Sequence, residues 1–186
     1  MITRPTGLLL IAVLLHTPAV EGQISGPEFR VNEGLSGTQR DPDVAVDAAG
    51  NSVIVWTRIG KGEDAEDVYV RRFNAAGSPL GGEVRVHGDA SLGQFTPAVA
   101  VAPDGRFVVA WTSHIEGKML EVRARMFGAD GTAVAEEFTV NTTPDSSQAS
   151  PAVAADDAGN FCIVWHSWFQ DGGDRGVYGR CFRADG

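Results

Sequence analysis

The sequence holds little cysteine and little positive charge, and these two shortages exclude some functions and some partners. Only two of the 186 residues are cysteines, and they form no Cys-x-x-Cys motif, so redox catalysis is not expected. There are 15 Lys and Arg against 24 Asp and Glu, which gives a formal net charge of −9. Because nucleic acids and anionic membrane surfaces attract basic proteins, neither is an expected partner. The sequence also lacks Gly-x-Ser-x-Gly, His-Glu-x-x-His and Walker motifs, so it nominates no catalytic residue.

The first 22 residues have the pattern of a secretory signal peptide. Arg4 precedes an apolar run over residues 7–15, and small residues follow at 17–22. The run is shorter than the roughly 20 residues of a spanning helix, so no stable membrane insertion is expected. The sequence therefore predicts a secreted, extracellular or periplasmic protein, with a signal peptide at 1–22 and a folded region at 23–186.

The folded region repeats one pattern three times. A Pro-x-Val-Ala stretch leads through a turn glycine into a strand that ends at Trp56, Trp111 or Trp165, and these tryptophans lie 55 and 54 residues apart. The units span about residues 28–82, 83–136 and 137–186. Repeats of about this length are the expected signature of β-propeller blades.

Each unit carries four strand signals and no helical periodicity. In the middle unit they fall at 99–101, 107–111, 121–127 and 138–140, with turns at Asp104-Gly105 and at 129–131. The first two are apolar on both faces, as in a covered central strand, and the fourth is short and mixed, as at an edge. The predicted fold is all-β, with three four-stranded antiparallel β-propeller-type blades in an open arc or as part of a larger propeller.

These motifs resemble β-propeller-like tandem repeats of exported bacterial proteins, and more distantly the delta-sixty repeat. The resemblance runs from Phe29 to the end and rests on Pro-x-Val-Ala, the turn glycine, Val-x-Trp and Arg-x-Phe. It implies the propeller fold and no catalytic residues.

The first and last units are out of phase. Residues 28–32 have the pattern of a fourth strand, whereas the last unit stops after a third strand at 177–182 and a turn. Three blades of this width do not close a ring. Two expectations follow: further blades in a longer chain, or a second copy that completes a six-bladed ring.

Recognition is expected on the loops at one end of the strands. Those loops vary between units, whereas the strands do not. The candidate ligand-binding residues there are Gln39, Gln94, Gln148, Trp168 and Phe169. The glutamines either bond the backbone of their loop or point into a central site, and the two aromatic residues offer a surface for a sugar or a peptide.

Acidic residues in the same loops raise the possibility of a Ca²⁺ site, because this ion prefers oxygen ligands. There is no EF-hand spacing, and solvated acidic loops are the other interpretation. No other cofactor is expected. The candidate ligands are Glu63, Asp64, Glu66, Asp67, Asp171 and Asp174.

Two further sets of recurring residues, the tryptophans and a group of arginines, are expected to have structural roles. The three tryptophans are expected to pack between blades. Arg71, Arg125 and Arg180 precede a phenylalanine by two residues. They are expected to stack on the blade tryptophan and bond backbone carbonyls, the alternative being a fork for a carboxylate or phosphate.

The two cysteines are predicted to form a disulfide. If the hairpin folds about Asp171-Gly172, Cys162 lies opposite Cys181, just as Trp165 lies opposite Tyr178. Opposed residues of a non-hydrogen-bonded pair lie about 4.5 Å apart at Cα, which a disulfide spans. Two buried thiols are the alternative.

The sequence as a whole favours an exported, non-catalytic binding or adhesion scaffold with a glycan or protein ligand. The alternative is a fragment of a propeller-fold hydrolase or lyase.

Overall fold

The computed structural model describes residues 26–60, 66–88, 93–114, 116–117 and 119–185. The predicted signal peptide lies outside them. Within these ranges the regular structure is entirely antiparallel strand, and no helix is long and apolar enough to cross a membrane. The strands are β1 Thr38–Val46, β2 Ser52–Ile59, β3 Glu66–Phe73, β4 Val84–Arg85, β5 Gln94–Val101, β6 Phe107–His114, β7 Leu120–Phe127, β8 Phe138–Thr139, β9 Gln148–Ala155, β10 Phe161–Trp168 and β11 Arg175–Phe182.

The strands form three sheets, each built around one of the repeated strands that carry Trp56, Trp111 and Trp165. The first has the order β1-β2-β3-β4, the second β5-β6-β7-β8 and the third β11-β10-β9. The all-β prediction is confirmed, but the four-strand count holds for only two sheets. In the third sheet no strand of the described residues pairs with the outer edge of β11.

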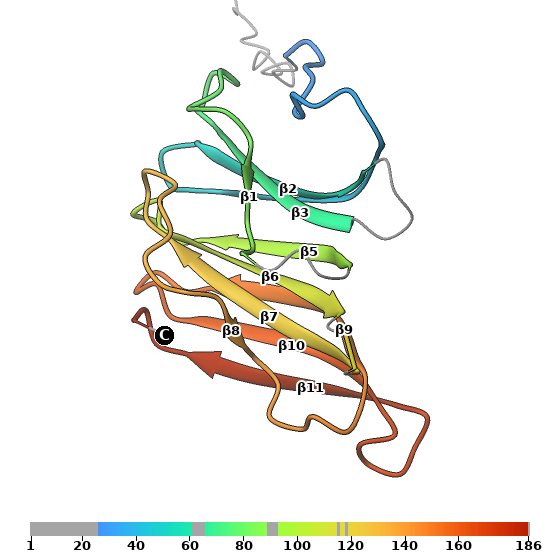
Figure 1. Ribbon diagram of the computed structural model, residues 1–186. Helices are drawn as coiled ribbons and strands as arrows, with labels where there is room; N and C mark the ends of the chain where they lie inside the picture. Colours follow the sequence, from blue (N-terminus) through green and yellow to red (C-terminus); the bar gives the residue numbers. More distant parts are fainter. Residues whose placement is uncertain (1–25, 61–65, 89–92, 115, 118, 186) are drawn as a thin grey trace, which may run out of the picture.

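The sheets lie in a stack, with the first and third at its two ends (Figure 1). The innermost strands of neighbouring sheets, β1, β5 and β9, contact one another in sequence. Between the first two sheets lies a core built around Val55, Val109 and Trp111. A second core, around Ala110, Ile163 and Trp165, lies between the second and third sheets. The middle sheet therefore contributes to both cores, because alternate residues of its apolar strands point to opposite faces.

The repeated arginines tie each sheet to the residue that follows the outer strand of the preceding sheet. Arg125 donates through Nη1 to the carbonyl of Val86, at 3.0 Å, and Arg180 donates in the same way to Val140, at 3.1 Å. The predicted carbonyl bonds are thus confirmed, but the predicted stacking partner is wrong. The guanidinium lies over the phenylalanine two residues later, 4.9 Å from the ring of Phe182 for Arg180. Alternation places that ring on the same strand face as the guanidinium.

Side-chain carboxylates close the tight turns between β1 and β2 and between β9 and β10. Asp156 accepts from the backbone and side-chain nitrogens of Asn160, each at 2.8 Å. Asp47 makes the same pair of bonds with Asn51. The side-chain hydrogen bond from the asparagine holds the pKa of each aspartate below its usual value. Between the aspartate and the asparagine of the third sheet lies Gly159, whose φ of 82° would strain the backbone of any residue with a side chain.

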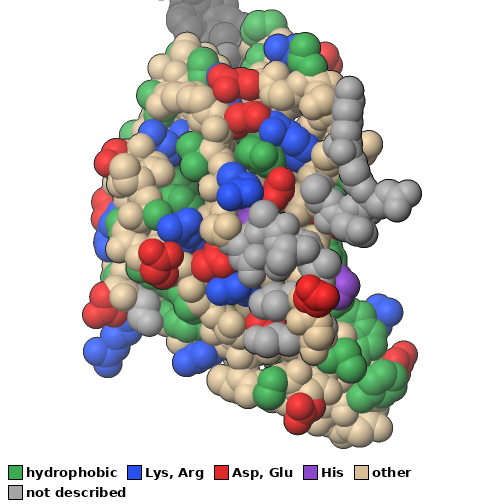
Figure 2. Space-filling view, in the orientation of Figure 1, with side chains coloured by type: hydrophobic (Ala, Val, Ile, Leu, Met, Phe, Trp, Pro, Cys, Tyr) green, Lys and Arg blue, Asp and Glu red, His purple; other side chains and the backbone are tan. Residues whose placement is uncertain are grey.

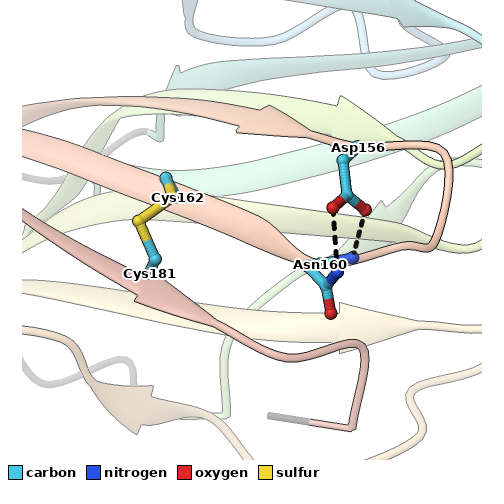
Figure 3. The surroundings of a disulfide bond; sticks show 4 residues. All are labelled: Asp156, Asn160, Cys162 and Cys181. Atoms are coloured by element: carbon cyan, nitrogen blue, oxygen red, sulfur yellow. Dashed lines mark hydrogen bonds between the residues drawn. A yellow bond between two sulfur atoms is a disulfide. The ribbon is translucent and has the colours of Figure 1, made fainter.

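The predicted disulfide joins Cys162 of β10 to Cys181 of β11 (Figure 3). The register is the predicted one: Trp165 pairs with Tyr178, and the two cysteines are directly opposed with Cα atoms 4.0 Å apart. Both cysteines are exposed, on the face of the third sheet that points away from the stack.

Candidate functional site

The variable loops and the repeated glutamines share one end of the strands, as the sequence predicts. Gln94 begins β5 opposite Ser113, near the end of β6, and Ser113 lies opposite Glu121 at the start of β7. The third sheet has the same arrangement around Gln148 and Ser167. We call this end of the molecule the loop end.

The glutamines are held by contacts inside the protein. Gln94 is buried and accepts a hydrogen bond of 2.8 Å from Nε1 of Trp111. Gln148 is also buried, and it donates to the carbonyl of Thr143 at 3.0 Å. Gln39 donates to the carbonyl of Ser36 at 3.2 Å. Bonding to the backbone of their own loop, one of the two predicted roles, therefore describes Gln39 and Gln148.

The acidic candidates are dispersed where the structure describes them. Glu66 pairs with Arg40 at 2.5 Å, and Asp67 lies 3.2 Å from Nε2 of His87. Asp171 and Asp174 lie in the β10–β11 loop of the third sheet, whereas Glu66 and Asp67 begin β3 of the first. Glu63 and Asp64 lie outside the described residues. Within those residues no three His, Cys, Asp or Glu side chains come together as a metal site.

Two aromatic side chains lie together in sequence at the loop end of the third sheet: Trp168, the last residue of β10, and Phe169, the first residue of the β10–β11 loop. Phe169 is 71 % exposed and has a φ of 58°, in the left-handed region. Its amide donates to the carbonyl of Asp174 at 3.1 Å, which closes the loop beneath it. The guanidinium of Arg175 lies 4.7 Å from the centre of the Trp168 ring. Hydrophobic side chains gather at this tip, at the lower right of Figure 2.

This arrangement makes the loop a shaped surface. A left-handed φ costs a residue other than glycine about 1–2 kcal/mol, so local bonds must fix it. The held loop exposes a phenyl ring beside a tryptophan that is covered on one side by a cation. Nearby, partial desolvation and then the negative charge of Asp171 raise the pKa of Tyr178. The hairpin therefore offers apolar ring faces with charged groups at their margin.

A second concave feature runs along the inner strands. It is an open groove of about 600 Å³, lined by the same four positions of β1, β5 and β9. At its edge Asp41, Thr96 and Ser150 have φ values of 51°, 48° and 56°, each directly before a proline. The amide of Ser150 donates to Oγ1 of Thr112 in the preceding sheet, at 3.0 Å. This strained position was not predicted from the sequence, although a polar residue directly before the proline recurs in all three repeats.

Comparison with known proteins places the fold but no family. No family model and no curated protein matches the chain. A protein of unknown function from Dyadobacter fermentans is similar in structure, with TM-score 0.58 and 16% identity over 82% of this chain and 40% of that one. A Hadza microbial sialidase gives TM-score 0.59 and 14% identity, over 81% and 36%.

An α-L-arabinofuranosidase from Lactobacillus brevis is similar at TM-score 0.51 and 15% identity, over 87% of this chain and 55% of that one. The chain thus spans between about a third and just over half of these structures. At such identities the likeness concerns the fold alone.

Proposed function

We propose that the chain is an exported, non-catalytic carbohydrate-binding module built from propeller-type repeats. The observation that carries the proposal is the aromatic hairpin, in which local bonds hold Phe169 exposed beside Trp168. Sugar rings present C–H faces that pack on aromatic rings, while their hydroxyls bond polar groups at the margin. Arg175, the first residue of β11, and Asp171, in the loop, supply such groups.

Two further observations support this proposal. Two of the similar structures are named as a sialidase and an α-L-arabinofuranosidase, both of which act on glycans. The disulfide suits an oxidising compartment, as does the predicted signal peptide.

Isothermal titration with sialylated oligosaccharides and arabino-oligosaccharides tests the proposal. We expect binding of at least one class, with an affinity reduced tenfold or more in Phe169→Ala and in Trp168→Ala. Leu80→Ala removes an exposed apolar side chain from the other end of the strands and should bind as the unaltered chain does. No binding at millimolar sugar, or equal binding by the Phe169 variant, would refute the proposal.

The second candidate is that the chain forms part of a glycoside-processing enzyme. The inner-strand groove favours it, because Asp41 and Asp43 line that groove. Asp43 already accepts a hydrogen bond of 2.9 Å from the amide of Val99, and Asp41 pairs with Arg40. Release of reducing sugar from arabinan, abolished by Asp43→Asn and retained by Phe169→Ala, would favour the enzyme over the binding module.

A further inference from the structure

The third sheet exposes the face that the other two sheets bury. Val68 in the first sheet, Val122 in the second and Val177 in the third occupy one repeat position, 54 and 55 residues apart. The first two are 0 % exposed and contribute to the two cores, whereas Val177 is 75 % exposed. Val164 is 44 % exposed, although Ala110 at its repeat position is fully buried. An apolar face of this kind is built for contact with another sheet.

The opposite end of the stack carries the complementary surface. Val109 and Trp111 of the middle sheet pack against the first sheet. Their repeat equivalents in the first sheet are Ile54 and Trp56, which alternation places on the face opposite the core residues Val53 and Val55. Trp56 is only 3 % exposed. Ile54 and Trp56 both line a hollow of about 140 Å³ together with Val31, Asn32, Gln39, Arg40 and Pro42. On the middle sheet the equivalent surface is covered by Val53 and Val55 of the first sheet. Cys162 and Val164 occupy the repeat positions of Val53 and Val55 in the third sheet.

Residues 28–32 supply the third part of this surface. Their sequence, Glu-Phe-Arg-Val-Asn, matches Glu137–Asn141, which includes β8. Arg71 donates to the carbonyl of Val31 at 2.8 Å, as Arg125 and Arg180 do to Val86 and Val140. The segment thus lies where the outer strand of a preceding sheet would lie, yet it forms no strand pair in the described part of the chain.

The two intact outer strands show what such a segment does for a sheet. The amide of Val140 donates to the carbonyl of Val122 at 2.8 Å, and Val86 donates to Val68 at 2.9 Å. The side chain of Asn141 returns the contact by accepting from the amide of Val122, at 2.9 Å. Val177 of the third sheet corresponds to Val122, and Asn32 of residues 28–32 corresponds to Asn141.

From these surfaces we propose that two copies of the chain associate head to tail. The first sheet and residues 28–32 of one copy cover the third sheet of the other. The strongest argument is continuity, because the chain forms this same contact twice within itself, between its first and second and its second and third sheets. The second copy carries the matching face by identity of sequence.

The repeat fixes the register of the contact. Tyr69 pairs with Arg85, and Arg123 pairs with Thr139, in the two complete sheets. Tyr178 therefore lies opposite Arg30 of the second copy, whose Asn32 accepts from the amide of Val177. Added strands gain main-chain hydrogen bonds as well as apolar burial. When each copy contributes both surfaces, the contacts close a ring of six sheets, three from each.

The first test is the mass in solution at physiological salt, where the charge of −9 on each copy is screened. Light scattering should give twice the mass of one chain, which is 19.7 kDa when residues 1–22 are retained and less once they are removed. Val164→Asp should give the mass of a monomer with an unchanged far-ultraviolet circular dichroism spectrum. Leu80→Asp is the matched control, since both side chains are 44 % exposed, and it should remain dimeric. A monomeric unaltered chain at 100 µM, or a dimeric Val164→Asp, overturns the proposal.

The second test is a cross-link between copies. In a Cys162→Val/Cys181→Met background, Arg30→Cys and Tyr178→Cys are introduced into separate preparations. Mixing and mild oxidation should give a disulfide-linked pair that contains one chain of each kind. Arg30→Cys mixed with a chain carrying cysteine at the loop position Gly173 should give none. Cross-linking that is equally efficient for both mixtures, or absent for the first, overturns the proposed register.

A failed dimer and a failed sugar-binding assay are separate results. Trp168 and Arg175 form the strand pair two residues beyond His166 and Val177, so they border the contact between copies. Phe169 lies in the loop beyond the last strand pair, and the Phe169→Ala variant therefore tests sugar binding independently of the dimer.

Discussion

The middle and third sheets come from the same repeat, yet they differ in how they are held. The middle sheet packs on both faces, with Trp111 turned toward the first sheet and Val122 toward the third. The third sheet packs on one face only and exposes Val177. Since the strand patterns are alike, the difference comes from the neighbouring sheet and not from the strand itself.

The third sheet has a covalent link where the middle sheet has packing. Cys162 and Cys181 occupy the repeat positions of Val108 and Met126, and Val108 is buried in the second core. A side chain that gains no burial contributes little hydrophobic stabilisation, whereas a disulfide stabilises chiefly by restricting the unfolded chain. The exposed sheet is thus stabilised by a means that does not depend on a neighbour.

Of the changes that test this difference between the sheets, removal of the disulfide should have the largest effect on the free energy of unfolding. The bond joins residues 19 apart, and closure of such a loop is worth about 3 kcal/mol. Cys162→Val/Cys181→Met, which installs the residues of the middle sheet, should lower the free energy of unfolding by about that amount in urea titrations. The unaltered chain unfolded in a reducing agent should have the same midpoint. A loss below about 1 kcal/mol would mean that the third sheet is held mainly by packing.

Truncation of the equivalent valines, Val122 and Val177, should lower the free energy of unfolding by smaller amounts, which differ between the two sites. Val122→Ala removes two buried methyl groups and leaves a cavity, for a cost of about 2 kcal/mol. Val177→Ala should cost less than about 0.5 kcal/mol in dilute, monomeric protein.

Protein concentration provides the control for this pair. In the proposed dimer a strand of the second copy covers Val177. The cost of Val177→Ala should therefore rise with protein concentration, while that of Val122→Ala should not. Equal costs of the two substitutions in dilute solution would contradict the exposure of Val177.

The smallest effect concerns the turn between β9 and β10. The middle sheet has Ala102 where the third has Asp156, whose pKa is lowered chiefly by its side-chain hydrogen bond with Asn160. The stabilisation is complete above the unfolded value of 3.8 and is lost as the pH falls through the folded pKa. Asp156→Asn should therefore lower the melting temperature slightly at pH 6, and the difference should vanish between about pH 5 and pH 2.

Asn74 makes the corresponding turn contacts without a charge, which makes asparagine a conservative replacement. A difference in melting temperature that is the same at pH 6 and pH 2 would show that the charge contributes nothing.

Much of the fold follows from the repeat spacing. A hairpin pairs residues of constant number sum, so the disulfide and the Trp165–Tyr178 pair could be predicted from the sequence. The hydrogen bond between Gln94 and Trp111 could not, because it depends on side-chain rotamers in a bulged region between Phe95 and Ala98. The stacking of the arginines on phenylalanine was missed for a similar reason, since two aromatic rings lay within reach of each guanidinium.

The candidate site was predicted in part. Variable loops with exposed aromatic residues pointed to Trp168 and Phe169, and the structure exposes Phe169. The inner-strand groove was missed, because it needs the three bulges to lie side by side, and no single repeat shows that arrangement.

The sharing of the middle sheet between two cores has a consequence for cooperativity. The first and third sheets touch chiefly through the middle one, so the molecule is a short one-dimensional array. Loss of either end sheet costs one interface, whereas loss of the middle sheet costs both. Partial unfolding should therefore proceed from the ends, with the backbone amides of β6 the last to exchange with solvent.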